Sequence, residues 1–372
     1  MRVFIIAGEV SGDMLGGAVM AGLRSLRPDI EFAGIGGAQM QAQGLQSQFP
    51  MSELSVMGIA EVLPKYFHLK RRIREAAAAA IAFQPDILLT IDSPDFSLRV
   101  AKIVRAAAPQ IRNVHYVAPS VWAWRPKRAQ KMAKVIDHVL ALLPFEPPYM
   151  TAAGMDCDFV GHPIATLQIA PPHETPAGPL VLVLPGSRRG EVERLSERFG
   201  AAIALFAADH PDARFILPMA VPVADLVREK VASWPVQPEL VLEAGAKAQA
   251  FRDADLALAA SGTVSLELAA NATPMVIAYD MGWISRKLIG ALMRIDTVTL
   301  VNLVSDTRAV PEFIGDNCRP APIARAMSQV LAEPSAQLDA MRVTMERLGR
   351  GGEAPGLRAA KAILQGLEKA RG

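Results

Sequence analysis

The sequence predicts an α/β protein with two doubly wound parallel-sheet domains that face each other across a cleft. The 372-residue chain is longer than the ~250 to 300 residues at which a single core usually divides. In each half, short apolar runs alternate with longer helical patterns. Strands separated by helices of this length form βαβ units with parallel strands. Hydrophobic residues make up 51% of the chain, which is enough for two buried sheets.

The first half contains the expected strands and helices in alternation. Apolar runs predict strands at residues 3–8, 30–36, 86–92 and 113–118. Helical patterns predict helices at residues 13–26, 71–83 and 96–107. The second half repeats the alternation, with strands expected at residues 180–186, 213–220, 239–245, 254–262 and 273–280.

The domain boundary is expected in a segment rich in Pro and Gly. Residues 161–179 lack periodicity, as is typical of a linker. We therefore expect an N-terminal domain at residues 1–165 and a C-terminal domain at residues 178–345. The remaining residues, 346–372, are expected to form a helical tail.

Composition excludes several classes of function. Lys and Arg number 39 and Asp and Glu 37, so no global field attracts nucleic acid. Cys157 and Cys318 match no metal or CxxC spacing and indicate a reducing compartment. No run approaches the ~18 apolar residues that span a bilayer, and the N-terminal run is too short for a signal peptide. We expect a cytoplasmic protein that still touches a membrane surface.

Phosphate chemistry is indicated at the turn after residues 180–186. In doubly wound sheets, ligands bind outside the carboxyl ends of the strands. This turn contains Gly186, Ser187 and Arg188 before a helix. Exposed backbone N–H groups at such a turn suit phosphate, and arginine adds a planar fork of donors. The alternative is a capped turn whose arginines are solvated.

A second turn of this kind follows residues 254–262. It contains Ser261, Gly262 and Thr263, and Glu267 lies about one helical turn further on. The helix N-terminus suits phosphate, while Glu267 suits a vicinal diol such as a ribose. The alternative is an ordinary Ser/Thr cap with Glu267 in a capping box. The usual nucleotide fingerprints are absent, since Gln39 replaces the third glycine of GxGxxG and no GxxxxGK[ST] occurs.

Asp92 is the candidate general base. It ends an unusually apolar strand, and Pro94 delays the following helix until after Asp95. A partly desolvated carboxylate at the mouth of a cleft is able to take a proton from an alcohol. The alternative is an Asx turn or a helix cap, and Asp95 fits the cap better than Asp92 does.

Several further residues are candidates for binding an acceptor or its sugar. Glu9, with Ser11 and Asp13, follows the first strand, where an acid suits sugar hydroxyls. His115 lies on an apolar strand, where a core histidine with satisfied hydrogen bonds is the more common outcome. In the tract VWAWRPKR, Trp124 and Arg125 show the aromatic and basic pattern that suits headgroups or phosphorylated ligands.

Residues 54–75 mix apolar and basic side chains, as an interfacial amphipathic helix does. The basic members include Lys65, Lys70, Arg71, Arg72 and Arg74. The apolar members form the expected membrane patch, which consists of Val56, Met57, Ile59, Val62, Leu63, Tyr66, Phe67 and Leu69. The alternative is a core-facing helix with a solvated basic face.

Taken together, these segments resemble the lipid-A-disaccharide synthases. The resemblance rests on motifs that occur in order along the chain: AGEVSGDMLG, MGIAEVLP, IDSPDF, HYVAPSVWAWRPKR, LPFE, GHP, LPGSRRGEV and ASGTVSLE. It implies the GT-B fold, in which two Rossmann-like domains hold a sugar nucleotide mainly through the C-terminal one. The catalytic Asp of the family falls on Asp92, and its UDP-contacting Arg falls on Arg188.

The resemblance also implies the reaction and its partners. The family condenses UDP-2,3-diacylglucosamine with 2,3-diacylglucosamine 1-phosphate (lipid X), inverts the anomeric centre and uses no metal or other cofactor. A peripheral position on the cytoplasmic surface of the inner membrane follows from its lipid substrates. A homodimer with exchanged C-terminal segments is a further implication.

Two alternatives stay open at this point. A UDP-N-acetylglucosamine 2-epimerase-like GT-B enzyme shares the two domains and the UDP site, but leaves the amphipathic stretch and the Trp-rich tract unexplained. A nucleotide-sugar-binding regulatory module without turnover would keep Arg188 and Glu267 and have no use for an acid at Asp92.

Overall fold

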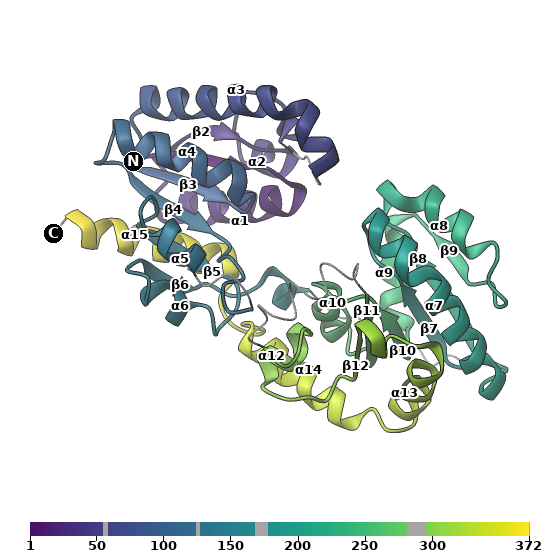
Figure 1. The fold of residues 1–372 in the computed structure, drawn as a ribbon. Helices are drawn as coiled ribbons and strands as arrows, with labels where there is room; N and C mark the ends of the chain where they lie inside the picture. The colour runs from purple at the N-terminus through teal and green to yellow at the C-terminus, as the bar shows by residue number, and fades with distance from the viewer. Residues whose placement is uncertain (55–58, 124–126, 168–177, 281–294, 372) are drawn as a thin grey trace. The chain divides into compact units, whose positions relative to one another are not determined.

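The computed structural model describes residues 1–54, 59–123, 127–167, 178–280 and 295–371. The chain divides into two compact units (Figure 1). Unit 1 comprises Met1–Pro163 with Gly351–Gly372, and unit 2 comprises Ile164–Arg350. Each unit contains a six-stranded sheet in which all neighbouring strands that are paired run parallel. The predicted α/β class is therefore confirmed.

The sheet of unit 1 has the strand order β2-β1-β3-β4-β5-β6. Its strands are β1 (Arg2–Ala7), β2 (Glu31–Ile35), β3 (Ile87–Ile91), β4 (Arg112–Tyr116), β5 (His138–Ala141) and β6 (Asp156–Phe159). The first four confirm the predicted strands with small shifts at their ends. β5 and β6 were not predicted, because β5 has four residues and β6 is an edge strand with two aspartates.

Helices cover both faces of this sheet. Alternate residues of β1 point to opposite sides, so Val3 packs with one core cluster and Phe4 with the other. The first cluster includes residues of α1 (Val10–Leu26) and α15 (Pro355–Arg371). The second includes residues of α3 (Ile59–Phe83) and α4 (Pro94–Ala107). Smaller helices are α2 (Ala38–Ala42), α5 (Lys127–Met132) and α6 (Pro147–Thr151).

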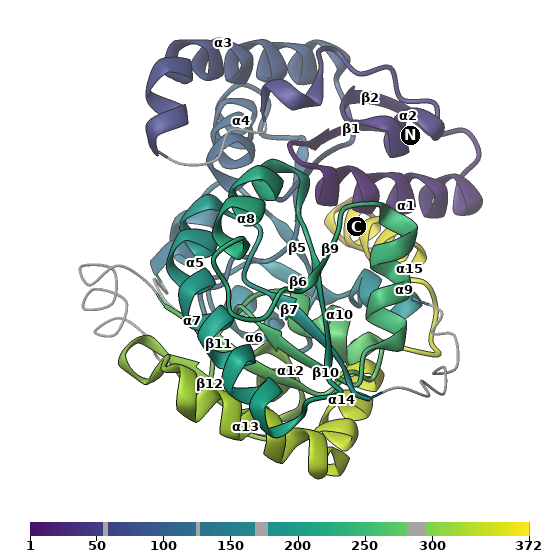
Figure 2. The ribbon, with the colours of Figure 1, turned by 90° about the vertical axis from the view of Figure 1, so that its right-hand side faces the viewer.

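The C-terminal helix α15 is part of unit 1. It lies beside α1 (Figure 2). A Cβ added at Gly22 of α1 would lie 2.7 Å from the Gly356 carbonyl oxygen, and one at Gly356 would lie 2.6 Å from the Ala18 oxygen. These glycines allow the two backbones to touch. The segment that we expected as a separate tail therefore contributes its last helix to the core of the first unit.

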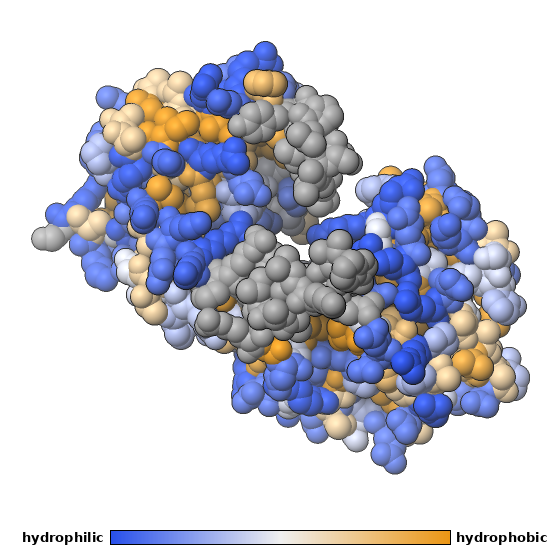
Figure 3. Space-filling model, viewed as in Figure 1, coloured by the Kyte–Doolittle hydropathy of each residue, from blue (hydrophilic) through white to orange (hydrophobic). Residues whose placement is uncertain are grey.

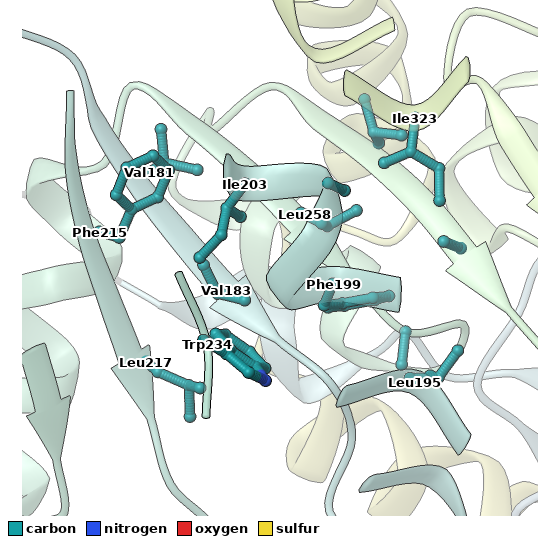
Figure 4. Packing of buried hydrophobic residues seen from close by; sticks show 14 of the residues in the cluster. Val181, Val183, Leu195, Phe199, Ile203, Phe215, Leu217, Trp234, Leu258 and Ile323 are labelled. Atoms are coloured by element: carbon teal, nitrogen blue, oxygen red, sulfur yellow. The ribbon is translucent and has the colours of Figure 1, made fainter. Parts of the chain in front are cut away.

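The sheet of unit 2 has the order β12-β11-β10-β7-β8-β9. Its strands are β7 (Leu180–Leu184), β8 (Arg214–Pro218), β9 (Glu239–Val241), β10 (Leu256–Ala259), β11 (Met275–Tyr279) and β12 (Glu312–Ile314). Its helices are α7 (Arg189–Asp209), α8 (Ala224–Val231), α9 (Ala244–Asp253), α10 (Val264–Ala270), α12 (Leu300–Ser305), α13 (Pro320–Ala332) and α14 (Ser335–Arg347). Side chains of β7 and β10 pack against Leu195, Phe199 and Ile203 of α7 (Figure 4).

Each sheet has one point at which the strand order reverses. In unit 1 the chain runs from β1 to β2 on one side and then crosses to β3 on the other, so the reversal lies between β1 and β3. In unit 2 it lies between β7 and β10. Ligands of doubly wound sheets bind at the carboxyl edge of such switch points. The fold therefore directs attention to the residues that follow these four strands.

Candidate active site

Strained backbone marks the switch point of unit 1. Asp92 and Ser93, which follow β3, have φ angles of +50° and +43°. Val117, which follows the neighbouring strand β4, has a φ of +83°, a genuine outlier for a β-branched residue. The Asp92 amide donates to the Tyr116 carbonyl at 3.0 Å, and the Val117 amide donates to the Leu140 carbonyl at 3.0 Å. Strain held in this way by surrounding hydrogen bonds is typical of functional sites.

The Asp92 carboxylate is oriented but still accessible. Its Oδ1 accepts a hydrogen bond from the Ser93 amide at 2.8 Å, and the residue is half-buried. The Ser97 hydroxyl donates to the Asp92 carbonyl oxygen at 2.8 Å, which fixes the backbone. The N-cap of α4 is Ser93 rather than Asp92. The helix-cap alternative for Asp92 is thus wrong, and the side chain bonds the amide of the next residue, Ser93, rather than the amide two residues on that defines an Asx turn.

Gly8, at the end of β1, makes room for this turn. A Cβ added at Gly8 would lie 2.5 Å from Ser93 Oγ and 2.9 Å from Ser93 Cβ. We expect Gly8→Ala to displace Ser93 and Asp92, lowering kcat and costing about 1–3 kcal/mol of stability. Gly12→Ala is the matched control, since a Cβ at Gly12 would be 3.4 Å from Ala7 Cβ, an ordinary contact. Kinetics and urea unfolding of both variants check this, and equal activity of the two would contradict it.

Of the three candidates after β1, Asp13 has a structural role. Its buried carboxylate accepts hydrogen bonds from the amides of Gly37, Gln39 and Met40 at 2.8, 2.8 and 3.1 Å. Asp13 therefore caps α2, and we withdraw it as a sugar-binding candidate. Glu9 is the N-cap residue of α1 and is half-buried, and Ser11 is exposed on the first turn. Both remain at the switch point.

His115 is a core residue. It is 2% exposed, and its Nδ1 lies 2.8 Å from Thr90 Oγ1 on the neighbouring strand. Burial, reinforced by the charge of Arg128, lowers the pKa of His115 to about 4. A side chain so buried does not reach a substrate, so its assignment as an acceptor-binding residue is wrong. The alternative considered from the sequence, a core histidine, is correct.

His115 should make stability depend on pH. The folded pKa of about 4 lies below the unfolded value of about 6.5, so the unfolded state binds more protons between these values. The neutral His115 therefore makes its full contribution to the free energy of unfolding above pH 6.5. This contribution, about 3 kcal/mol, is lost as the pH falls towards 4. We expect the free energy of unfolding in urea to fall less between pH 7 and pH 4.5 in His115→Gln than in the parent chain. An unchanged loss would contradict this assignment.

In unit 2, the turn after β7 presents Arg188. Gly186 has a φ of +115° and is followed by Ser187 and by Arg188, the N-cap residue of α7. The Arg188 side chain is 69% exposed. The turn lies beside the one after β10, because β7 and β10 are paired through Leu184 and Ala259. The two turns that the sequence singles out thus meet at the switch point of one sheet.

Glu191, which was not among the predicted site residues, organises this turn. Its buried carboxylate accepts from the amides of Ser187 and Arg188 at 3.1 and 3.3 Å, and its Oε1 accepts from Arg188 Nη1 at 3.3 Å. A Cβ at Gly186 would lie 2.5 Å from Glu191 Oε2. The expectation that these two amides are open to phosphate is therefore wrong. The exposed charged group of this turn is the guanidinium of Arg188. A Glu three residues after an N-cap was the signal available in the sequence.

The turn after β10 is built differently. Ser261 is half-buried, and Gly262 and Thr263 are exposed. The hydroxyl of Ser265 donates to the Gly262 carbonyl at 2.9 Å. Thr263 is the N-cap of α10 and makes no side-chain capping hydrogen bond in the described structure. The Ser/Thr-cap alternative for Thr263 is therefore not realised. Glu267, on the first turn of α10, is an exposed residue, and partial desolvation of its carboxyl raises its pKa.

Trp124 and Arg125 lie outside the described residues. Trp122, from the same tract, is half-buried, and its ring packs edge-on against Phe145 with centroids 5.1 Å apart. Within the described part of the chain, no group of three or more His, Cys, Asp or Glu side chains is placed to hold a metal ion.

Comparison with known proteins decides the family. The family model for lipid-A-disaccharide synthetase matches residues 3–361. A lipid-A-disaccharide synthase from Ruegeria pomeroyi is 61% identical, over 99% of this chain and 96% of the relative. One from Rhodospirillum centenum is 44% identical, over 99% and 95% of the two chains.

The chain belongs to the lipid-A-disaccharide synthase family. The resemblance seen in the sequence motifs is thereby confirmed. Membership shows a glycosyltransferase role in lipid A disaccharide synthesis, and the family match covers both Asp92 and Arg188.

Solved structures show how widely the family's fold is shared. UDP-N-acetylglucosamine 2-epimerase from Neisseria meningitidis bound to UDP-GlcNAc is similar with a TM-score of 0.64 at 13% identity, covering 99% of this chain and 100% of that one. The calicheamicin glycosyltransferase CalG4 is similar with a TM-score of 0.57 at 17% identity, covering 100% and 99%. At these identities the likeness shows the GT-B type of fold alone. The epimerase alternative therefore rests only on fold similarity.

The amphipathic stretch at residues 54–75 is described in part. Val56 and Met57 lie outside the described residues, as do the side chains of Ile59, Val62, Leu63 and Tyr66. Phe67 is 82% exposed, whereas Leu69 packs partly buried against the core, so we remove Leu69 from the patch. Figure 3 shows apolar surface over α3 bordered by hydrophilic side chains. In the described residues, no helix combines the length and apolar character needed to cross a bilayer.

Proposed function

We propose that this chain is an inverting glycosyltransferase. It transfers 2,3-diacylglucosamine from UDP-2,3-diacylglucosamine to the 6-hydroxyl of lipid X, giving the β-1,6-linked disaccharide 1-phosphate and UDP. Family membership supports the disaccharide-forming role. The single observation that carries the finer proposal is the strained, half-buried Asp92 at the switch point of unit 1.

Asp92 is the general base of the proposed reaction. Its carboxylate takes the proton of the acceptor hydroxyl as that oxygen attacks C1 of the donor sugar. The hydrogen bond from the Ser93 amide holds Oδ1, which orients the carboxylate before substrate arrives. Such preorganisation avoids reorientation of the base during the reaction. One displacement of this kind inverts the configuration at C1.

Arg188 stabilises the leaving group. As the bond between C1 and the diphosphate breaks, negative charge grows on UDP, and a planar guanidinium pairs well with it. The Glu191 hydrogen bonds fix the backbone from which Arg188 extends. Ser261, Gly262, Thr263 and Glu267, on the adjacent turn, complete the proposed UDP site. In this proposal the arginine supplies the positive charge that a metal supplies in other transferases, so the reaction needs no metal or other cofactor.

The lipid substrates require contact with the cytoplasmic surface of the inner membrane. Phe67, Lys70, Arg71 and Arg74 are exposed on α3 at spacings of three, four and seven residues, so they share one face of the helix. An exposed aromatic ring among basic side chains suits the interface of an anionic bilayer. We propose that this face meets the membrane.

The proposal is tested by incubating the purified chain with both substrates in detergent and a chelator. Mass spectrometry should show the disaccharide 1-phosphate, and UDP should be released only when lipid X is present. Conversion of UDP-2,3-diacylglucosamine without lipid X would favour the epimerase-like alternative. Absence of turnover with intact UDP binding would favour the regulatory module.

A further inference from the structure

Glu146 is a buried acid that the proposed chemistry does not use. It follows β5 in the segment LPFE and is 4% exposed. Its Oε2 accepts a hydrogen bond from the Leu143 amide at 3.0 Å, and its Oε1 accepts one from Trp122 Nε1 at 3.4 Å. Trp122 follows β4, the strand that pairs with β5. The contact therefore joins the segments after two neighbouring strands at the carboxyl edge of unit 1.

Trp122 and Phe145 form an aromatic pair at this edge. Their rings are edge-on, at an interplanar angle of 84°, and both residues are half-buried. The same edge carries Asp92, since β3, β4 and β5 are consecutive in the sheet. The indole is held from one side by the Phe145 ring and from its nitrogen by Glu146. Apart from its Nε1, the indole is apolar, and a half-buried ring fixed by two contacts suits the apolar face of an acylated sugar.

The carboxyl of Glu146 changes its protonation near neutral pH. Burial, offset by the hydrogen bonds from Leu143, Trp122 and Leu142, raises the pKa of Glu146 to about 7. The titratable group that faces it from β6 is the thiol of Cys157, which stays neutral because burial, with the charges of Glu146 and Asp158, raises its pKa to about 12. An ionised carboxylate accepts hydrogen bonds more strongly than a protonated one.

We propose that Glu146 is a positioning residue that fixes the Trp122 indole as a contact for the acylated acceptor sugar, and that it does so in its ionised form. This inference rests on the proposed function for the identity of the ligand. The contact between Glu146 and Trp122 itself is independent of any reaction.

Kinetics of Glu146→Gln test the role in acceptor binding. At pH 8 its KM for lipid X should be about tenfold above that of the parent chain, as expected for loss of one charge-assisted hydrogen bond, with kcat little changed. At pH 6 the ratio of the two KM values should approach one, because the parent Glu146 is then protonated. Titration of the lipid X phosphate affects both chains equally, so it cancels in the ratio of their KM values at one pH. Equal KM values at pH 8 would overturn the proposal.

Trp122→Phe keeps a ring and removes the N–H donor. Its KM for lipid X at pH 8 should rise as in Glu146→Gln, and the double variant should be no worse than either single one, because both remove the same interaction. Trp234→Phe is the matched control, since Trp234 Nε1 is buried in unit 2 without a hydrogen-bond partner in the described structure. If the two substitutions raised KM for lipid X additively in the double variant, they would not act through one shared contact between Glu146 and Trp122, which would contradict the proposal.

Fluorescence separates this inference from the proposed function. The difference in emission between the parent chain and Trp122→Phe isolates the contribution of Trp122. This contribution should change with an inflection near pH 7 in the parent chain, whereas in the Glu146→Gln background it should not. Failure of the transferase assay with an intact titration would overturn only the proposed function. A titration that persists in Glu146→Gln would overturn the coupling.

Discussion

Replacement of Asp92 by Asn should lower disaccharide formation by about 10²- to 10⁴-fold, the contribution of a positioned general base. The amide has nearly the same shape and can still accept from the Ser93 amide, but it cannot take a proton. UDP binding, measured by calorimetry, should stay within about twofold of the parent value, because Arg188 and the other proposed UDP contacts lie in unit 2.

Asp95→Asn is the control for this variant. Asp95 is exposed on the first turn of α4, three residues from Asp92, and its replacement changes the charge by the same amount. We expect it to retain nearly full activity. Equal losses in Asp92→Asn and Asp95→Asn would show that net charge matters, and full activity of Asp92→Asn would remove Asp92 from the mechanism.

Arg188→Ala should show the second large effect, a loss of about 10- to 100-fold in UDP affinity and in kcat/KM for the donor. The adjacent Arg189 gives a matched control. Both are exposed arginines paired with a glutamate, Arg188 with Glu191 at 3.3 Å and Arg189 with Glu193 at 3.0 Å. Only Arg188 is fixed at the N-cap by the Glu191 carboxylate.

Arg189→Ala should therefore change donor binding by less than about twofold, as is usual for a solvated surface charge. Calorimetric titration of UDP into both variants distinguishes the two arginines. A loss in Arg189→Ala as large as that in Arg188→Ala would mean that the turn attracts UDP by general charge. It would contradict the role given to Arg188.

The fold was predictable where the sequence is apolar. Strands such as β3 and β7 are buried at every residue, so they appear as continuous apolar runs. β6 is an edge strand with the sequence DCDF, and β12 has three half-buried residues, so neither has such a run. The packing of α15 on α1 depends on contacts between residues more than 300 positions apart, and no local pattern shows it.

The candidate site was predictable from the positions where strands end more than from side-chain chemistry. Gly186 and Asp92 stand where strands end, and the structure places both at switch points. The partners of the buried acids were not predictable. Asp13 accepts from amides 24 to 27 residues away, and Glu146 binds an indole 24 residues away. Such pairings follow from strand order, which spacing along the chain does not reveal.

Fold alone does not select the reaction of this chain. The GT-B type of fold is shared by an epimerase and a glycosyltransferase at comparable TM-scores, and one fold supports many activities. What distinguishes the proposed reaction is an acid that takes a proton from an acceptor alcohol while UDP leaves. The stereochemistry of the product records that event.

The anomeric configuration of the product tests the central claim most directly. In the proposed reaction the donor sugar is joined to UDP through an α linkage, so a single displacement assisted by Asp92 gives a β-linked disaccharide. The one-bond coupling between C1 and H1 of the new linkage, measured by NMR, should report the β configuration. An α-linked product would mean retention at C1 and would contradict the role proposed for Asp92.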